Sequence, residues 1–190
     1  MFNPMVQSLA PIALLYTRGS ASIDGATRFQ KLIFLAQMEE DLGEKYEFHE
    51  GKYGPYSPTL SSDLRYFEEN GYIERNAVTN SAGNEKHVFG LTDEGYTLAR
   101  KMIDKGSFDA ILQSATRTKS KFNNWSLDRL LEYVYGRYPG YITRSELDIE
   151  RLFDPEADSQ FLDQGLSYLG PNPENSLDIN SSAEDVFSIE

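Results

Sequence analysis

The spacing of apolar residues along the chain predicts a protein made mostly of helices. Small polar residues that suit a helix N-cap precede several of the expected helices: Asp24, Ser57, Thr92 and Ser126. Gly71 follows residues 58–69 as a helix-ending glycine would. Apolar side chains recur every three or four positions, as on one face of a helix, in residues 4–17, 26–42, 58–69 and 107–117 and in the stretches that follow Thr92 and Ser126.

Shorter segments have the alternating pattern of strands. Residues 72–78 and 86–91 flank the polar stretch 79–84, which predicts a β-hairpin. Residues 46–50 also alternate and predict a short, half-exposed strand. The resulting order of helix, helix, loop, helix, hairpin and helix is the winged-helix arrangement.

These patterns predict an α+β fold, mostly α, in which a winged helix-turn-helix carries additional C-terminal helices. We expect an N-terminal helix in residues 1–19 and the winged helix-turn-helix in residues 20–105. A helical extension would follow in residues 106–152. Residues 153–190 are rich in Asn, Ser, Asp and Pro, which favours a flexible acidic tail.

The composition excludes several classes of function. The 190 residues include no cysteine and two histidines, so disulfides, thiolate nucleophiles and cysteine-bound zinc are impossible. No segment approaches the roughly 18 apolar residues that a membrane-spanning helix needs. No phosphate-binding glycine motif and no nucleophile motif is present. We therefore expect a cytoplasmic protein that has no membrane partner, cofactor or metal and is not an enzyme.

The negative charge is concentrated at the C-terminal end. The formal net charge is −12, and residues 152–190 hold nine acidic residues and no lysine or arginine. The rest of the chain is therefore nearly balanced. The acidic end would repel nucleic acid, although acidic surfaces are also typical of proteins from a salt-rich cytoplasm.

Three segments together resemble a known group of proteins. They are Phe29-Gln-Lys-Leu-Ile-Phe-Leu-Ala-Gln37, Tyr53-Gly-Pro-Tyr-Ser-Pro58 and Leu91-Thr-Asp-Glu-Gly95, with Leu64 and Gly71-Tyr-Ile73 between them. The set resembles small winged-helix proteins of the YwgA-like type, which are similar in pattern to SocA-like antitoxins that carry the Panacea domain. The resemblance spans about residues 26–147. It implies a winged helical domain that either binds DNA or neutralises a protein in a defence or toxin–antitoxin setting.

A winged helix that binds DNA inserts its second helix in the major groove and lays its hairpin on the backbone. Here helix 58–69 would face the bases, because arginine reads guanine and Ser or Thr bonds to bases or phosphates. The hairpin and the loop before the helix would contact the backbone. The expected contacts are Lys52, Tyr53, Thr59, Ser61, Ser62, Arg65, Tyr66, Asn80, Asn84 and Lys86. This pattern predicts a transcriptional regulator that binds double-stranded DNA.

A second basic cluster and an apolar first helix leave other partners open. Arg117, Lys119 and Lys121 could bind phosphate, an acidic partner or the chain's own acidic tail, or could lie in a solvated linker. The first helix has no charged residue before Arg18, so a monomer would struggle to bury it, which favours a homodimer. The alternative function is a protein-interaction module, such as an antitoxin-like or defence-system component.

Overall fold

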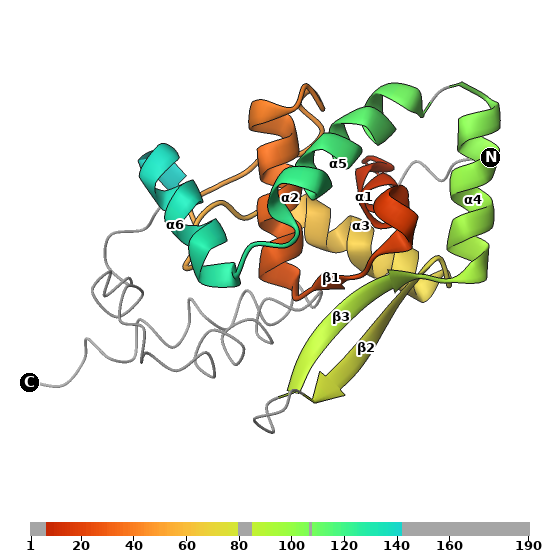
Figure 1. The fold of residues 1–190 in the computed structure, drawn as a ribbon, viewed down its shortest axis with the longest axis horizontal. Coiled ribbons are helices and arrows are strands. Elements are labelled where there is room, and N and C mark those ends of the chain that lie inside the picture. Colours follow the sequence, from red (N-terminus) through yellow and green to blue (C-terminus); the bar gives the residue numbers. More distant parts are fainter. Residues whose placement is uncertain (1–6, 80–84, 107, 142–190) are drawn as a thin grey trace, which may run out of the picture.

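The computed structural model describes residues 7–79, 85–106 and 108–141. These residues form a mostly helical α+β fold with a small antiparallel sheet (Figure 1). The helices are α1 (Ala10–Ser20), α2 (Ala26–Glu39), α3 (Pro58–Glu69), α4 (Asp93–Asp104), α5 (Asp109–Phe122) and α6 (Leu127–Arg137), and a short 3-10 turn covers Pro139–Tyr141. The strands are β1 (Ile23–Asp24), β2 (Ile73–Thr79) and β3 (Glu85–Leu91).

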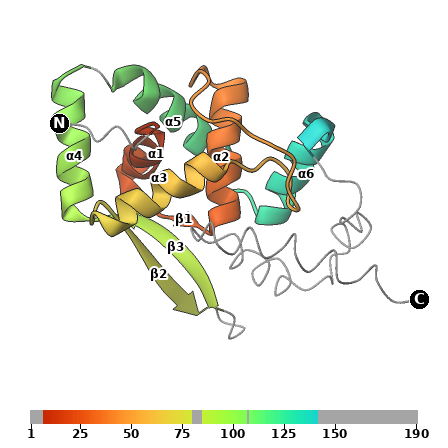
Figure 2. The same cartoon turned by 180° about the vertical axis from the view of Figure 1, so that it is seen from behind.

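The sheet has the order β1-β3-β2, with both pairs antiparallel. β2 and β3 pair from Ile73 opposite Leu91 to Thr79 opposite Glu85, as the predicted hairpin requires. β1 adds Ile23 opposite Phe89 on the other side of β3. The hairpin extends away from the helices, as Figures 1 and 2 show.

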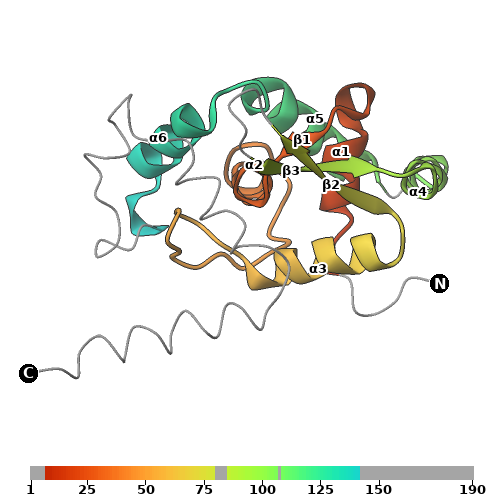
Figure 3. The ribbon, with the colours of Figure 1, turned by 90° about the horizontal axis from the view of Figure 1, so that it is seen from below.

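The helices form layers around α1. Figure 3 shows α1 and α2 between α3 on one face and α5 on the other, with α4 and α6 at opposite ends of the body. The core is built mainly from apolar side chains of α1 and α2, and side chains of α3, α5, α6 and the sheet complete it. Ile12, Leu14 and Leu15 of α1 are fully buried within a single chain.

The burial of α1 corrects one expectation from the sequence. The sequence suggests that a monomer would struggle to bury this apolar helix, but α2, α4, α5 and β3 of the same chain surround it. α1 also begins at Ala10 and loses helical geometry at Thr17, where Arg18 and Gly19 adopt positive φ angles of 54° and 66°. The first helix therefore gives no reason for a dimer.

Several local predictions are confirmed. α3 covers the predicted residues 58–69, and Ser57, Thr92 and Ser126 each accept a hydrogen bond from the backbone N–H three residues later. Gly71 has a φ of 72°, the left-handed conformation of a helix-ending glycine. These features depend on neighbouring residues alone, so the sequence pattern could reveal them.

Three local predictions are wrong. Asp24 does not cap α2, because it lies in β1 and its carboxylate binds Lys86. Residues 46–50 form no strand apart from a single bridge between His49 and Tyr56. α5 continues to Phe122 instead of ending near residue 117, because Phe122 packs into the core on the same side as Ala115.

Candidate nucleic-acid interface

The candidate site is the outer face of α3. The Ser57 hydroxyl accepts a hydrogen bond from the Leu60 N–H at 3.3 Å, and Pro58 occupies the first helical position. Leu60, Leu64 and Phe67 are buried, as the apolar spacing predicts. Because these residues fix which side of α3 faces the core, the opposite side of the helix, with Thr59, Ser62 and Arg65, faces outward.

Four of the predicted contacts share that outward face. Thr59 and Ser62 are exposed, and Arg65 and Tyr66 are half-buried. Residues three or four positions apart lie above one another on a helix, so these side chains form one polar stripe along α3. The Ser62 hydroxyl donates to the Pro58 carbonyl at 3.1 Å.

Two predicted contacts do not reach this surface. Ser61 is 8% exposed, and its hydroxyl accepts a hydrogen bond from the Gln30 amide at 3.0 Å. Tyr53 is 4% exposed and packs in the loop before α3. Both residues are therefore removed from the candidate contacts, because a ligand outside the protein cannot reach their side chains. Lys52 stays exposed, with its ammonium 5.9 Å from the centre of the Tyr53 ring.

The remaining predicted contacts belong to the hairpin. Lys86 lies on β3, and its ammonium is 2.6 Å from the Asp24 carboxylate, on the side of β1. It therefore faces away from α3. Asn80 and Asn84 lie outside the described residues.

Arg75 of β2 is a cation at this surface that the sequence analysis missed. Its guanidinium is 3.2 Å from the Glu68 carboxylate, which joins the hairpin to α3. The sequence could have indicated this position. Arg75 follows the buried Ile73 by two residues, so both side chains lie on the same face of the strand.

Three cations of the described surface are paired with carboxylates, whereas Lys52 lies over the Tyr53 ring. Arg65 lies 3.7 Å from Glu69, Arg75 pairs with Glu68, and Lys86 pairs with Asp24. A phosphate must compete with these carboxylates for each of the paired cations. The surface is therefore polar but not strongly positive.

Asp63 of α3 lies on the inner side of the helix and is 1% exposed. Because its carboxylate is buried, Asp63 adds no negative charge to the outward face of α3. Its carboxylate accepts hydrogen bonds from the N–H groups of Gln7 and Ser8 at 3.1 Å and from the Tyr46 hydroxyl at 2.7 Å. Burial raises the pKa of Asp63, although these hydrogen bonds oppose the shift. Asp63 therefore anchors α3 to the segment that leads into α1.

The loop before α3 is held by two consecutive residues of α2. The Gln30 amide donates to the Ser57 carbonyl at 3.0 Å and accepts from the Ser57 N–H at 2.9 Å. The buried Lys31 ammonium donates to the Pro55 carbonyl at 3.0 Å. Gly54 has a φ of 81°, and a Cβ there would lie 2.8 Å from the Tyr135 ring. The residues that carry the family resemblance in this region therefore hold the loop in place.

The second basic cluster is engaged by groups of the chain itself: Arg117 and Lys121 are exposed but paired with carboxylates, and Lys119 is buried. Arg117 donates to the Glu40 carboxylate at 3.0 Å, and Lys121 donates to the Glu39 carboxylate at 2.8 Å. Lys119 is 1% exposed, and its ammonium donates to the carbonyls of Leu14 at 2.8 Å, Leu15 and Thr17 at 3.3 Å, and Ala21. It thereby caps the C-terminal end of α1. Lys119 cannot bind a phosphate, an acidic partner or the acidic tail while it occupies this position.

Glu39, the last residue of α2, is a further charged residue whose side chain is almost fully buried. The hydroxyls of Tyr133 and Tyr138 donate to its carboxylate at 2.9 and 3.1 Å, beside Lys121. Burial alone would raise the pKa of Glu39, but the hydrogen bonds from Lys121, Tyr133 and Tyr138 together lower it. The ionised carboxylate joins α2 to α5 and α6.

The described residues contain no group of three or more His, Asp or Glu side chains that could hold a metal ion. Within the same residues, every helix is too short or too polar to cross a membrane.

Comparisons with protein-family models, with curated proteins and with solved structures found no match to this chain. The resemblance noted in the sequence therefore stays a prediction.

Proposed function

We propose that the protein is a winged-helix transcriptional regulator that binds double-stranded DNA through α3 and the β2–β3 hairpin. The element order α1, β1, α2, α3, β2, β3 supports this proposal because it is the order of a winged-helix domain. The position of β3 between β1 and β2 also agrees with that arrangement. In such a domain α3 enters the major groove and the hairpin contacts the backbone.

The outward polar stripe of α3 is the observation that carries the proposal. Thr59, Ser62 and Arg65 lie on the face that the core leaves free. Arginine can donate two hydrogen bonds to guanine, and the hydroxyls of Ser and Thr can bond to a base or a phosphate. Arg65 would therefore supply most of the base discrimination, while Thr59 and Ser62 would help to set the register of the helix.

The paired charges of this surface lead to a testable prediction. Replacing Glu69 by Gln removes the carboxylate next to Arg65 and one negative charge from the surface. We expect Glu69→Gln to raise the affinity for a random DNA duplex by roughly three- to tenfold at low salt, because Arg65 becomes free to contact phosphate. Fluorescence anisotropy of a labelled duplex, titrated at several salt concentrations, measures the effect.

Glu132→Gln is the matched control, since it makes the same charge change on the exposed side of α6. Arg65→Ala should weaken binding to a selected operator far more than binding to random duplex. An operator can be selected from a random duplex library with the full chain. Failure of both the wild type and Glu69→Gln to bind duplex at low salt would rule out the DNA proposal.

A second candidate function is binding of a protein through the same face. Glu68 and Glu69 lie on α3 beside the cations that they neutralise, so this surface also suits a partner with basic groups. A stable partner should be recovered from native extract with the wild-type chain and lost with Ser62→Arg. Recovery of no partner, together with DNA binding, would favour the first proposal.

A further inference from the structure

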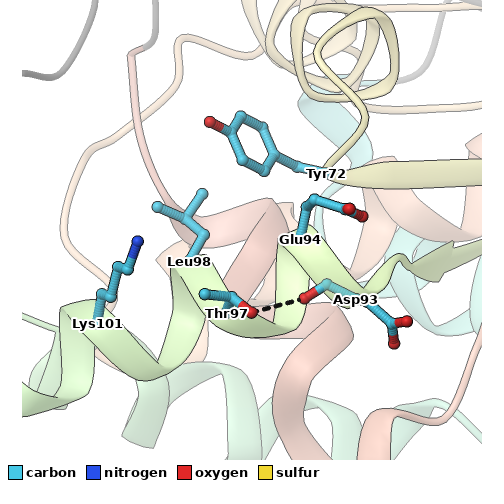
Figure 4. A pocket seen from close by; sticks show the side chains of 6 residues that line it. All are labelled: Tyr72, Asp93, Glu94, Thr97, Leu98 and Lys101. Carbon is cyan, nitrogen blue, oxygen red and sulfur yellow. Dashed lines mark hydrogen bonds between the residues drawn. The ribbon is translucent and has the colours of Figure 1, made fainter.

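The outer side of α4 forms an open hollow of about 290 Å³. It is lined by Tyr72, Asp93, Glu94, Thr97, Leu98 and Lys101. Figure 4 shows that the side chains of Glu94, Leu98 and Lys101 follow one another along α4, with the Tyr72 ring facing Leu98 and Glu94. The hollow thus has an apolar middle, an acidic end and a basic end.

The apolar face of α4 is incompletely covered by the other residues that the structure describes. Gly95 and Ala99 are its buried residues, whereas Leu98, Met102 and Ile103 are only partly buried. By contrast, α2 buries an unbroken run from Phe29 to Ala36. α4 therefore presents apolar surface that a second molecule could cover.

We infer that α4 packs antiparallel against α4 of a second copy of this chain, in a twofold homodimer. The order of charges along the helix selects this occupant. Glu94 and Lys101 are exposed and lie seven residues apart, about two helical turns, on either side of Thr97 and Leu98. A twofold axis between Thr97 and Leu98 places Glu94 of each copy opposite the partner's Lys101.

The same axis brings the apolar middles of the two hollows together. Leu98 of each copy then covers the Tyr72 side of the other, and the two Glu94–Lys101 pairs form at the rim. A parallel arrangement would instead place like charges opposite each other, which is unfavourable. The face of a single helix is smaller than the roughly 800 Å² per partner of a standard interface, so the dimer forms in the micromolar range. This inference does not depend on DNA binding.

Charge reversal tests the pairing. In sedimentation velocity from about 1 to 200 µM, the wild type should change from the 21.6 kDa monomer to a dimer as its concentration rises. Glu94→Lys or Lys101→Glu alone should weaken the dimer by roughly tenfold or more, since each places like charges opposite each other at two symmetry-related positions. The double variant Glu94→Lys/Lys101→Glu should restore dimerisation to within about threefold of the wild type.

The double variant separates pairing from stability. Glu94 lies in the first turn of α4 and Lys101 in its last turn, so each reversal opposes the helix dipole and the two costs add. Recovery of the dimer in a variant that is less stable than either single variant cannot come from stability. Glu132→Lys on α6 controls for the change in net charge, and Leu98→Arg should abolish the dimer.

A wild type that stays monomeric over the whole concentration range would overturn the inference. So would a dimer that responds equally to Glu94→Lys and Glu132→Lys, or a double variant that stays as weak as the single ones.

Discussion

Gly95→Ala is expected to destabilise the protein by about 3 kcal/mol or more, although alanine favours a helix over glycine. A Cβ at Gly95 would lie 2.0 Å from the Tyr72 carbonyl oxygen and 3.0 Å from Leu91. The first of these atoms belongs to the backbone, so no side chain can move aside to relieve the contact.

Moving α4 away from β2 would also break the bonds that start the helix. The Thr92 hydroxyl accepts a hydrogen bond from the Gly95 N–H at 3.1 Å, and the Thr92 N–H donates to the Tyr72 carbonyl at 3.2 Å. The junction between β2, β3 and α4 therefore requires a residue without a Cβ at position 95.

Gly136→Ala provides the matched control. Gly136 also lies within a helix, α6, but it is exposed and a Cβ there would meet no atom within 4 Å. This substitution should stabilise the protein by roughly 0.5 to 1 kcal/mol, because glycine loses more conformational freedom on folding. Urea denaturation of both variants should show that Gly95→Ala lowers the free energy of unfolding and Gly136→Ala raises it. A Gly95→Ala variant as stable as the wild type would contradict the close approach of α4 to Tyr72.

The second large effect is a rise of stability with pH, caused by two buried lysines. Burial lowers the pKa of Lys31 from 10.5 to about 7. Burial, aided by the charge of Arg18, lowers the pKa of Lys119 from 10.5 to about 8. The pKa of Lys119 is lowered less because its ammonium is less deeply enclosed by the protein than that of Lys31.

The direction of this pH dependence follows from the number of protons bound by the folded and the unfolded chain. From about pH 7 or 8 upward the folded chain has released protons that the unfolded chain keeps until about pH 10.5. Raising the pH in this window therefore favours folding, and lowering it toward pH 7 removes the stability. Each lysine contributes up to about 1.4 kcal/mol per pH unit.

Lys31→Met should lower the slope of stability against pH by about 1.4 kcal/mol per unit, since methionine fills similar space without a charge. The Lys31→Met variant should be more stable than the wild type near pH 7, and this difference in stability should disappear by about pH 9.5. Urea denaturation in steps between these values measures the slope, and the exposed Lys105→Met is the control. A slope unchanged by Lys31→Met would mean that Lys31 keeps its proton in the folded chain.

The predictions from the sequence succeeded where neighbouring residues supply the information. Ser57, Thr92 and Ser126 cap the helices that they precede, and the apolar stripe of α3 identified Leu60, Leu64 and Phe67 as buried. β1 was not predicted, because a strand of two residues is too short to show an alternating pattern. It pairs with β3, which lies more than sixty positions later in the sequence.

The predictions failed most clearly for charged residues. A lysine in a sequence is expected in water, because burying an unpaired charge is costly. Lys31 and Lys119 can be buried because backbone carbonyls accept hydrogen bonds from their ammonium groups. For Lys119 some of these carbonyls lie about a hundred residues away in the sequence. The residues near a lysine in the sequence cannot predict such a distant hydrogen-bonding partner.

Spacing and caps in the sequence were therefore enough to predict the order of the helices, the hairpin and the outward stripe of α3, although not every helix end. Which polar residues remain accessible depends instead on contacts between distant parts of the chain. The tertiary structure buried Ser61, Tyr53, Asp63 and Lys119 and left Thr59, Ser62 and Arg65 accessible. The physical reason is that a polar side chain can be buried wherever the fold supplies a hydrogen-bonding partner, and such partners come from distant parts of the chain.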